Sequence, residues 1–66
     1  MTRNQPDDNC HISTGAILNG NVKVERDTFI GSGAKIMNGI TIGKNSIIGM
    51  GLSVRHDQKD NSKFTG

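Results

Sequence analysis

An aliphatic residue returns at every sixth position through most of this 66-residue chain. Two positions before each of them stands a small or aliphatic residue, which shares its face if the backbone is extended. A helix would need a period near 3.6 residues, so the pattern predicts short strands whose two columns point into one core. The first column is Ile12, Leu18, Val24, Ile30, Ile36, Ile42, Ile48 and Val54, and the second is Cys10, Ala16, Val22, Thr28, Ala34, Ile40, Ser46 and Leu52.

Three positions after each aliphatic residue comes a residue type that enters the left-handed backbone region at little cost. Such a residue predicts a corner in every hexad, and glycines this frequent also disfavour a helix. If three hexads close one triangular coil, residue n lies beside residue n+18 at the ordinary strand spacing of about 4.8 Å. The predicted corner residues are Gly15, Asn21, Asp27, Gly33, Gly39, Asn45 and Gly51.

The repeat therefore predicts an all-β fold, a single-stranded parallel β-helix of about two and a half to three coils. We expect an irregular N-terminal segment over residues 1–8, the repeat domain over residues 9–56, and a polar C-terminal loop or tail over residues 57–66. A core of this size only marginally offsets the entropy lost on folding, so we also expect oligomerisation.

Composition excludes several function classes. The net charge is +2, the charges are interleaved, and the only aromatic residues are Phe29 and Phe64, which disfavours a nucleic-acid surface. The lone Cys10 cannot form an internal disulfide bond, and no apolar run is long enough to span a membrane. We therefore expect a cytoplasmic protein that binds neither membranes nor nucleic acids.

One of the three outer faces is predicted to carry no formal charge. Its first column is His11, Phe29 and Ile47, and its second column is Ser13, Gly31 and Gly49. An apolar column on a β-helix this small predicts a homotrimer that associates through the face of His11, Phe29 and Ile47. A ligand groove is the alternative, and both uses can share the surface. Glycine corners would leave backbone amides uncovered for an extended ligand, although the corner geometry alone also explains glycine.

Two histidines could act as a base in acyl transfer, since imidazole is well matched to neutral pH. His11 points outward on the uncharged face, whereas His56 lies about half a coil away. The two cannot clasp one metal ion within one chain, so no metal site is predicted. Cys10 points inward and receives no chemical role.

Three segments resemble a known family: Cys10 through Val22, Phe29–Ile30–Gly31–Ser32–Gly33–Ala34, and Ile47–Ile48–Gly49–Met50–Gly51. They are similar to the hexapeptide-repeat acyltransferases, and most similar to the sialic acid O-acetyltransferase and bacillosamine-type sugar N-acetyltransferase branch. The resemblance implies a left-handed coil, a homotrimer, and acetyl-coenzyme A held between adjacent subunits.

The same resemblance implies roles for individual residues. His11 matches a histidine that contacts acetyl-coenzyme A. The catalytic histidine of that branch stands nine residues earlier, where this chain has Thr2 followed by Arg3. No residue is therefore assigned as the catalytic base, and His11 is a possible substitute. The positions that would line the coenzyme are His11, Gly31, Ser32, Gly33, Gly49, Met50 and Gly51.

The sequence thus predicts an acetyl-coenzyme A-dependent sugar O- or N-acetyltransferase-like domain. The missing histidine indicates impaired or absent catalysis, and a chain cut at both ends of the family pattern indicates a fragment. The alternative is a non-catalytic trimeric assembly module that retains the β-helix. Coenzyme binding discriminates between the two, because only the first requires it.

Overall fold

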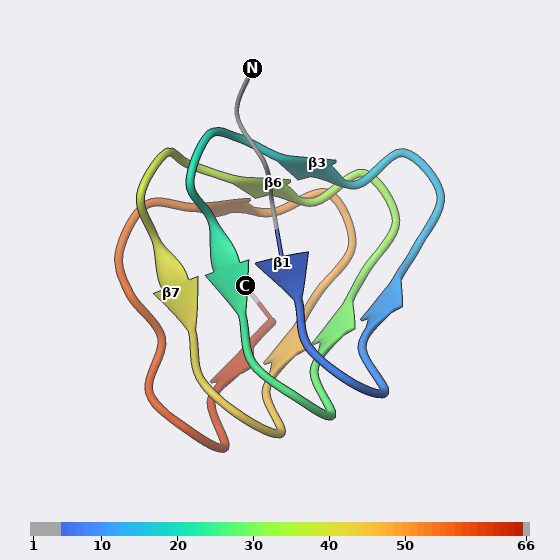
Figure 1. Ribbon diagram of the computed structural model, residues 1–66. Coiled ribbons are helices and arrows are strands. Elements are labelled where there is room, and N and C mark those ends of the chain that lie inside the picture. The colour runs from blue at the N-terminus through green and yellow to red at the C-terminus, as the bar shows by residue number, and fades with distance from the viewer. Residues whose placement is uncertain (1–4, 66) are drawn as a thin grey trace.

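Residues 5–65 form a parallel β-helix of about three coils in the computed structural model, and they contain no helix (Figure 1). Each coil contributes one two-residue strand to each of three sheets, named here by their central strands. The predicted fold class is therefore confirmed. The β4 sheet has the order β1-β4-β7, the β5 sheet β10-β8-β5-β2, and the β6 sheet β3-β6-β9. The strands are β1 Gln5–Pro6, β2 His11–Ile12, β3 Ile17–Leu18, β4 Lys23–Val24, β5 Phe29–Ile30, β6 Lys35–Ile36, β7 Thr41–Ile42, β8 Ile47–Ile48, β9 Ser53–Val54 and β10 Lys63–Phe64.

The register between successive coils is the predicted step of 18 residues from β1 to β9. Phe29 lies opposite both His11 and Ile47 in parallel pairs. The His11 amide donates to the Thr28 carbonyl at 2.9 Å, and the Phe29 amide donates to the Ser46 carbonyl at 2.9 Å. Backbone groups are thus satisfied between coils rather than within a strand.

Every predicted corner residue has a positive φ, between 56° at Asn45 and 77° at Gly15. Glycine and asparagine reach this left-handed region at little cost, which explains their regular recurrence. Two further residues, Asn9 and Asn61, have φ values of 59° and 62°. Corners therefore occur beyond the hexads that the aliphatic period identified.

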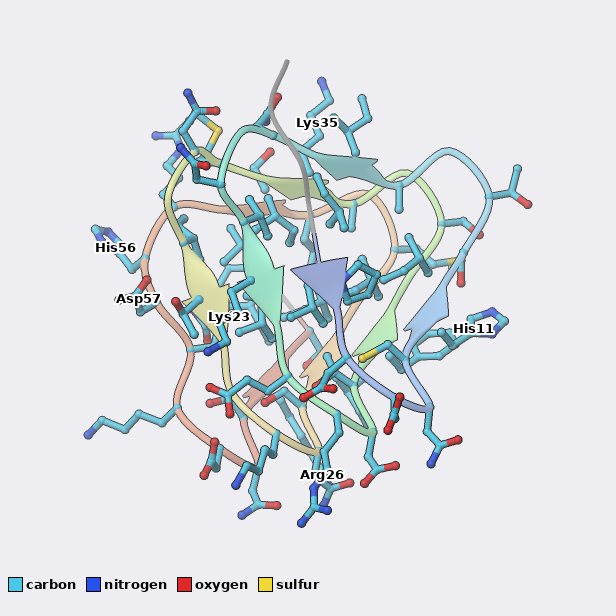
Figure 2. The ribbon with its side chains drawn as sticks, in the orientation of Figure 1. His11, Lys23, Arg26, Lys35, His56 and Asp57 are labelled. Carbon is cyan, nitrogen blue, oxygen red and sulfur yellow. The ribbon has the colours of Figure 1, made fainter. Side chains whose placement is uncertain are left out.

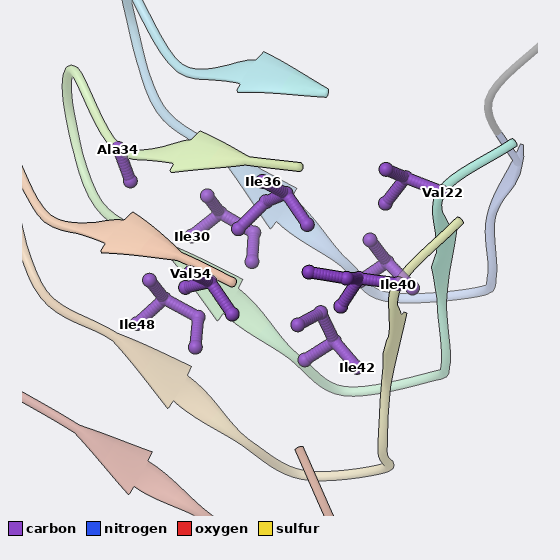
Figure 3. Packing of buried hydrophobic residues seen from close by; sticks show 9 residues of the cluster. Val22, Ile30, Ala34, Ile36, Ile40, Ile42, Ile48 and Val54 are labelled. Atoms are coloured by element: carbon purple, nitrogen blue, oxygen red, sulfur yellow. The ribbon is translucent and has the colours of Figure 1, made fainter. Parts of the chain in front are cut away.

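Inward and outward positions alternate as the period predicts. Charged side chains such as Lys23, Arg26 and Lys35 project away from the coil (Figure 2). Ile12 and Leu18 are only half-buried, because no strand of the described chain lies above β2 and β3. The central aliphatic residues fill the interior, and the buried core consists of Val22, Val24, Ile30, Ala34, Ile36, Ile40, Ile42, Ile48 and Val54 (Figure 3).

A hydroxyl is built into the corner between the β4 and β5 sheets. The Thr28 Oγ1 donates to the Gly43 carbonyl at 2.9 Å and accepts from the Ser46 amide at 3.4 Å, so it bridges the turn of the next coil. The equivalent turn between the β5 and β6 sheets is closed directly, since the Ala34 amide donates to the Gly31 carbonyl at 3.2 Å. This difference explains why one inward column is polar while the corresponding column at the other corner begins with alanine.

The polar column continues in both directions from Thr28. The Ser46 Oγ donates to the Lys59 carbonyl at 3.1 Å and accepts from the Ser62 amide at 3.2 Å. At the other end the Cys10 thiol donates to the Glu25 carbonyl at 3.0 Å. Cys10 therefore serves this column as a weak donor, and no buried side-chain nitrogen or oxygen within residues 6–65 lacks a partner.

The last coil is two residues shorter than the others. Strand β10 pairs with β8 so that Lys63 lies opposite Ile47, a step of 16 residues. Side-chain carboxylates accept two backbone bonds where the ladder shortens. The Asp57 Oδ1 accepts from the Thr41 amide at 2.9 Å, and the Asp60 Oδ1 accepts from the Lys44 amide at 2.8 Å.

The ladder extends beyond residues 9–56, the span predicted for the repeats. Strand β1 pairs with β4 inside the segment expected to be irregular, and β10 lies inside the expected C-terminal loop. Pro6 is compatible with a strand because β1 lies at the edge of its sheet. Phe64 packs half-buried against the core below Ile48, as the inward residue of the last coil.

The bridging hydroxyl gives a first testable prediction. We expect Thr28→Val to lower the free energy of unfolding by about 1–3 kcal/mol, because it leaves the buried Gly43 carbonyl and Ser46 amide without their partner. Urea unfolding measures the effect. Thr41→Val is the matched control at a half-exposed position, where we expect a change within about 0.5 kcal/mol. Equal effects of the two substitutions would show that the bridge contributes nothing.

Candidate functional site

The outer face of the β5 sheet brings the predicted column together. His11, Phe29 and Ile47 are successive partners in register, which confirms that they share one face. Phe29 and Ile47 remain 42% and 40% exposed, which is high for large apolar side chains. Figure 2 shows His11 projecting outward from the coil.

The imidazole of His11 stacks on the phenyl ring of Phe29. The two ring centroids are 5.0 Å apart and the ring planes differ by 5°. No group within residues 5–65 forms a hydrogen bond with the imidazole nitrogens of His11. The ring is therefore held by its face, while its nitrogens stay available to a ligand.

Lys63 corrects the expectation that this face is uncharged. It lies directly opposite Ile47 in β10 and is exposed, so the column runs from imidazole through phenyl and aliphatic side chains to a cation. The 18-residue step hid it, because the last coil has 16 residues. A local signal was present: residues 61–64, Asn-Ser-Lys-Phe, repeat residues 45–48, Asn-Ser-Ile-Ile.

Packing requires a glycine at position 31. Gly31 is buried, and a Cβ atom there would lie 2.7 Å from the Met50 nitrogen and 2.8 Å from the Gly49 carbonyl carbon. Gly49 is less crowded, since its Cβ would lie 3.1 Å from Leu52 Cδ1. Close stacking of coils therefore accounts for Gly31 without a ligand.

The remaining predicted positions lie at the corner between the β5 and β6 sheets. Ser32, Gly33, Met50 and Gly51 are all exposed there, and Met50 is 75% exposed. The Gly33 amide donates to the Thr14 carbonyl at 3.2 Å, and the Gly51 amide donates to the Ser32 carbonyl at 2.9 Å. The expectation that these amides are uncovered is wrong, because the ladder uses them.

Open space, rather than free amides, is what the corner offers a ligand. No atom lies within 4 Å of the position that a Cβ atom of Gly51 would take. An extended ligand could approach the backbone closely at this point. The corner and the column of His11 belong to the same sheet end, so one elongated molecule could contact both.

The other candidate residues lie apart from this face. His56 is exposed, and Figure 2 places it on the opposite side of the coil from His11. Residues 5–65 contain no group of three histidine, cysteine, aspartate or glutamate side chains that could hold a metal ion. The same residues form no helix able to cross a membrane. Thr2 and Arg3 lie outside the described residues.

Comparisons with known proteins agree with the fold. A family model described as the hexapeptide repeat of succinyl-transferase matches residues 21–55. The chain is 43% identical over 47 residues to the galactoside O-acetyltransferase of Lactococcus lactis subsp. lactis (strain IL1403), an alignment that covers 71% of this chain and 23% of that protein. No solved structure matches the chain significantly.

A second relative carries out a different transfer. The chain is 29% identical over 65 residues to the 2,3,4,5-tetrahydropyridine-2,6-dicarboxylate N-succinyltransferase of Xylella fastidiosa (strain Temecula1 / ATCC 700964), covering 86% of this chain and 24% of that protein. The chain spans about a quarter of the length of these two relatives. The family match holds β5 to β9 and covers more than half of the chain. This chain belongs to the hexapeptide-repeat acyltransferase family.

Proposed function

We propose that this chain is the coil-forming part of an acetyl-coenzyme A-dependent transferase that acylates a hydroxyl or amino group of a sugar. The observation that carries the proposal is the exposed His11 imidazole, whose nitrogens are free of protein hydrogen bonds on the outer face of the β5 sheet. Family membership supports the transfer of an acyl group. The galactoside O-acetyltransferase among the relatives supports a sugar acceptor.

The residues present fit an extended coenzyme. Open space beside Gly51 would admit its amide-bearing arm, with the exposed Ser32 and Met50 on either side of the contact. Lys63 would offer a positive charge to its phosphates. The coenzyme supplies an activated thioester when it is bound.

The charge pattern favours acetyl over succinyl as the transferred group. A succinyl group ends in a carboxylate, which needs a cation or several donors once it is removed from water. The outward residues of β2, β5 and β8 are uncharged, as are Ser32, Gly33, Met50 and Gly51. A neutral acyl group therefore suits the surface near His11.

His11 would take the proton that the acceptor loses when the acyl group is transferred. The resemblance places the catalytic histidine of the family at Thr2, so His11 would act as a substitute on a site built for another base. A general base contributes about 10²–10⁴-fold to the rate, and we therefore expect weak activity from this chain.

Coenzyme titration tests the proposal directly. We expect calorimetry to detect binding of acetyl-coenzyme A to the purified chain, with weaker binding of succinyl-coenzyme A. His11→Ala should reduce the affinity about three- to tenfold, because it removes one contact of hydrogen-bond strength. Absence of heat at ligand concentrations up to about 1 mM would remove the transferase proposal.

Two glycine variants separate packing from ligand contact. Gly31→Ala should lower the free energy of unfolding by about 1–3 kcal/mol, since its Cβ would collide with the backbone of the next coil. Gly51→Asn should change stability by less than about 1 kcal/mol, because asparagine already adopts this conformation at Asn21 and Asn45. Its side chain should nevertheless weaken acetyl-coenzyme A binding in calorimetry. Unchanged binding would place the coenzyme elsewhere.

A non-catalytic assembly module is the second candidate. It is favoured by the exposed apolar side chains of Phe29 and Ile47, which are adjacent in one column on a very small fold. Such a column is typical of an association surface, and identical chains commonly use one patch symmetrically. In this case we propose a homotrimer that forms through the face of His11, Phe29 and Ile47 and does not bind coenzyme.

Charge reversal of the apolar character tests the assembly. We expect Phe29→Lys to convert the oligomer into monomers, because it buries an unpaired charge in the interface. Light scattering measures the mass. Ile17→Lys is the control, since Ile17 is 46% exposed but belongs to the β6 sheet. A wild-type chain that is already monomeric would contradict the trimer.

A further inference from the structure

The parallel rings of His11 and Phe29 are the most specific geometry on the outer surface. Their centroids lie 5.0 Å apart with a 5° angle between the planes. Strand pairing places the two residues directly opposite one another, so the separation of the rings follows the separation of the strands. Their parallel orientation needs matching rotamers as well, which the backbone register alone does not impose.

His11 has few other restraints. It is exposed, it occupies a two-residue strand at the end of its sheet, and its imidazole forms no hydrogen bond within residues 5–65. Its backbone is fixed, since the amide donates to the Thr28 carbonyl at 2.9 Å. The phenyl ring below is therefore the contact that limits rotation of the imidazole about its side-chain bonds.

Phe29 is itself better supported than His11. It lies in the interior of the sheet, between β2 and β8, with Ile47 opposite it on the far side. The adjoining residues Thr28 and Ile30 are both buried. A ring anchored in this way can restrain a neighbour that lies at the end of the ladder.

We infer that Phe29 is a positioning residue for His11: the phenyl ring holds the imidazole plane so that its nitrogens face the ligand surface. This inference rests on the proposed function, since it concerns the ligand that His11 contacts. Restricting a side chain before binding removes part of the ordering cost of the complex. The size of aromatic pair interactions corresponds to an affinity change of about two- to tenfold.

The test combines spectroscopy of the free chain with acetyl-coenzyme A calorimetry. Phe29→Leu should shift the His11 imidazole proton resonances downfield, because the ring current of the phenyl group is lost, and should weaken coenzyme binding about two- to tenfold. Phe29→Tyr should preserve both the resonances and the affinity. Ile17→Val, at an exposed apolar position of the β6 sheet, should also leave both unchanged.

The double variant gives the decisive comparison. In a His11→Ala background, Phe29→Leu should cause no further loss of affinity, since no imidazole remains to be positioned. An equal loss with and without His11, or unchanged His11 resonances in Phe29→Leu, would overturn the inference. Sedimentation of every variant at the same concentration excludes a change of oligomeric state as the cause.

The two proposals fail in different ways. If the wild-type chain binds no coenzyme, the transferase proposal fails and the positioning role fails with it. If the wild type binds and only His11→Ala weakens binding, the proposed function stands and Phe29 has no positioning role.

Discussion

Every strand of this protein depends on the hydrogen-bond ladder between residue n and residue n+18, because a strand of two residues has no stability of its own. The ladder requires a corner after each strand, and a corner residue with positive φ occurs three positions after each inward aliphatic residue. Glycine, asparagine and aspartate are the residue types that accept this conformation. The same requirement decides which side chains point inward. A substitution that changes a corner therefore affects the core and the outer surface together.

The three corners of the coil are not equivalent, and the hydroxyl column makes the difference. Thr28 and Ser46 each bridge a carbonyl and an amide of the following coil, whereas the Ala34 amide closes its own turn. The bridge persists through the shortened last coil, where Ser46 still contacts both Lys59 and Ser62. Two residues are lost between Val54 and Ser62, and aspartate carboxylates accept the bonds there. The polar corner is thus the part of the ladder that keeps its geometry when the coil length changes.

The inward columns and seven corners could be predicted from the sequence, because steric preference and burial act on each residue type directly. The last strand was missed because a search at a fixed period fails after a two-residue deletion, although the Asn-Ser-Lys-Phe segment repeats an earlier hexad. The same slip hid Lys63 and left the face apparently uncharged. Glycine amides were expected to be free, but each corner amide also has a place in the ladder, which depends on the neighbouring coil. The stack of His11 on Phe29 depends on rotamers, and a residue pattern does not specify those.

Function in this fold must come from departures from the repeat. Inward positions have to recur in every coil, since each one contacts its equivalents above and below. Outward positions are free of that restriction, and one outward column here changes from His11 to Phe29, Ile47 and Lys63. An imidazole, a ring, an aliphatic group and a cation are thereby spaced along one surface at strand intervals. This separation also explains how an O-acetyltransferase and an N-succinyltransferase can both match one short chain: the match follows the scaffold, and the outward columns are where the choice of acyl group and acceptor can differ.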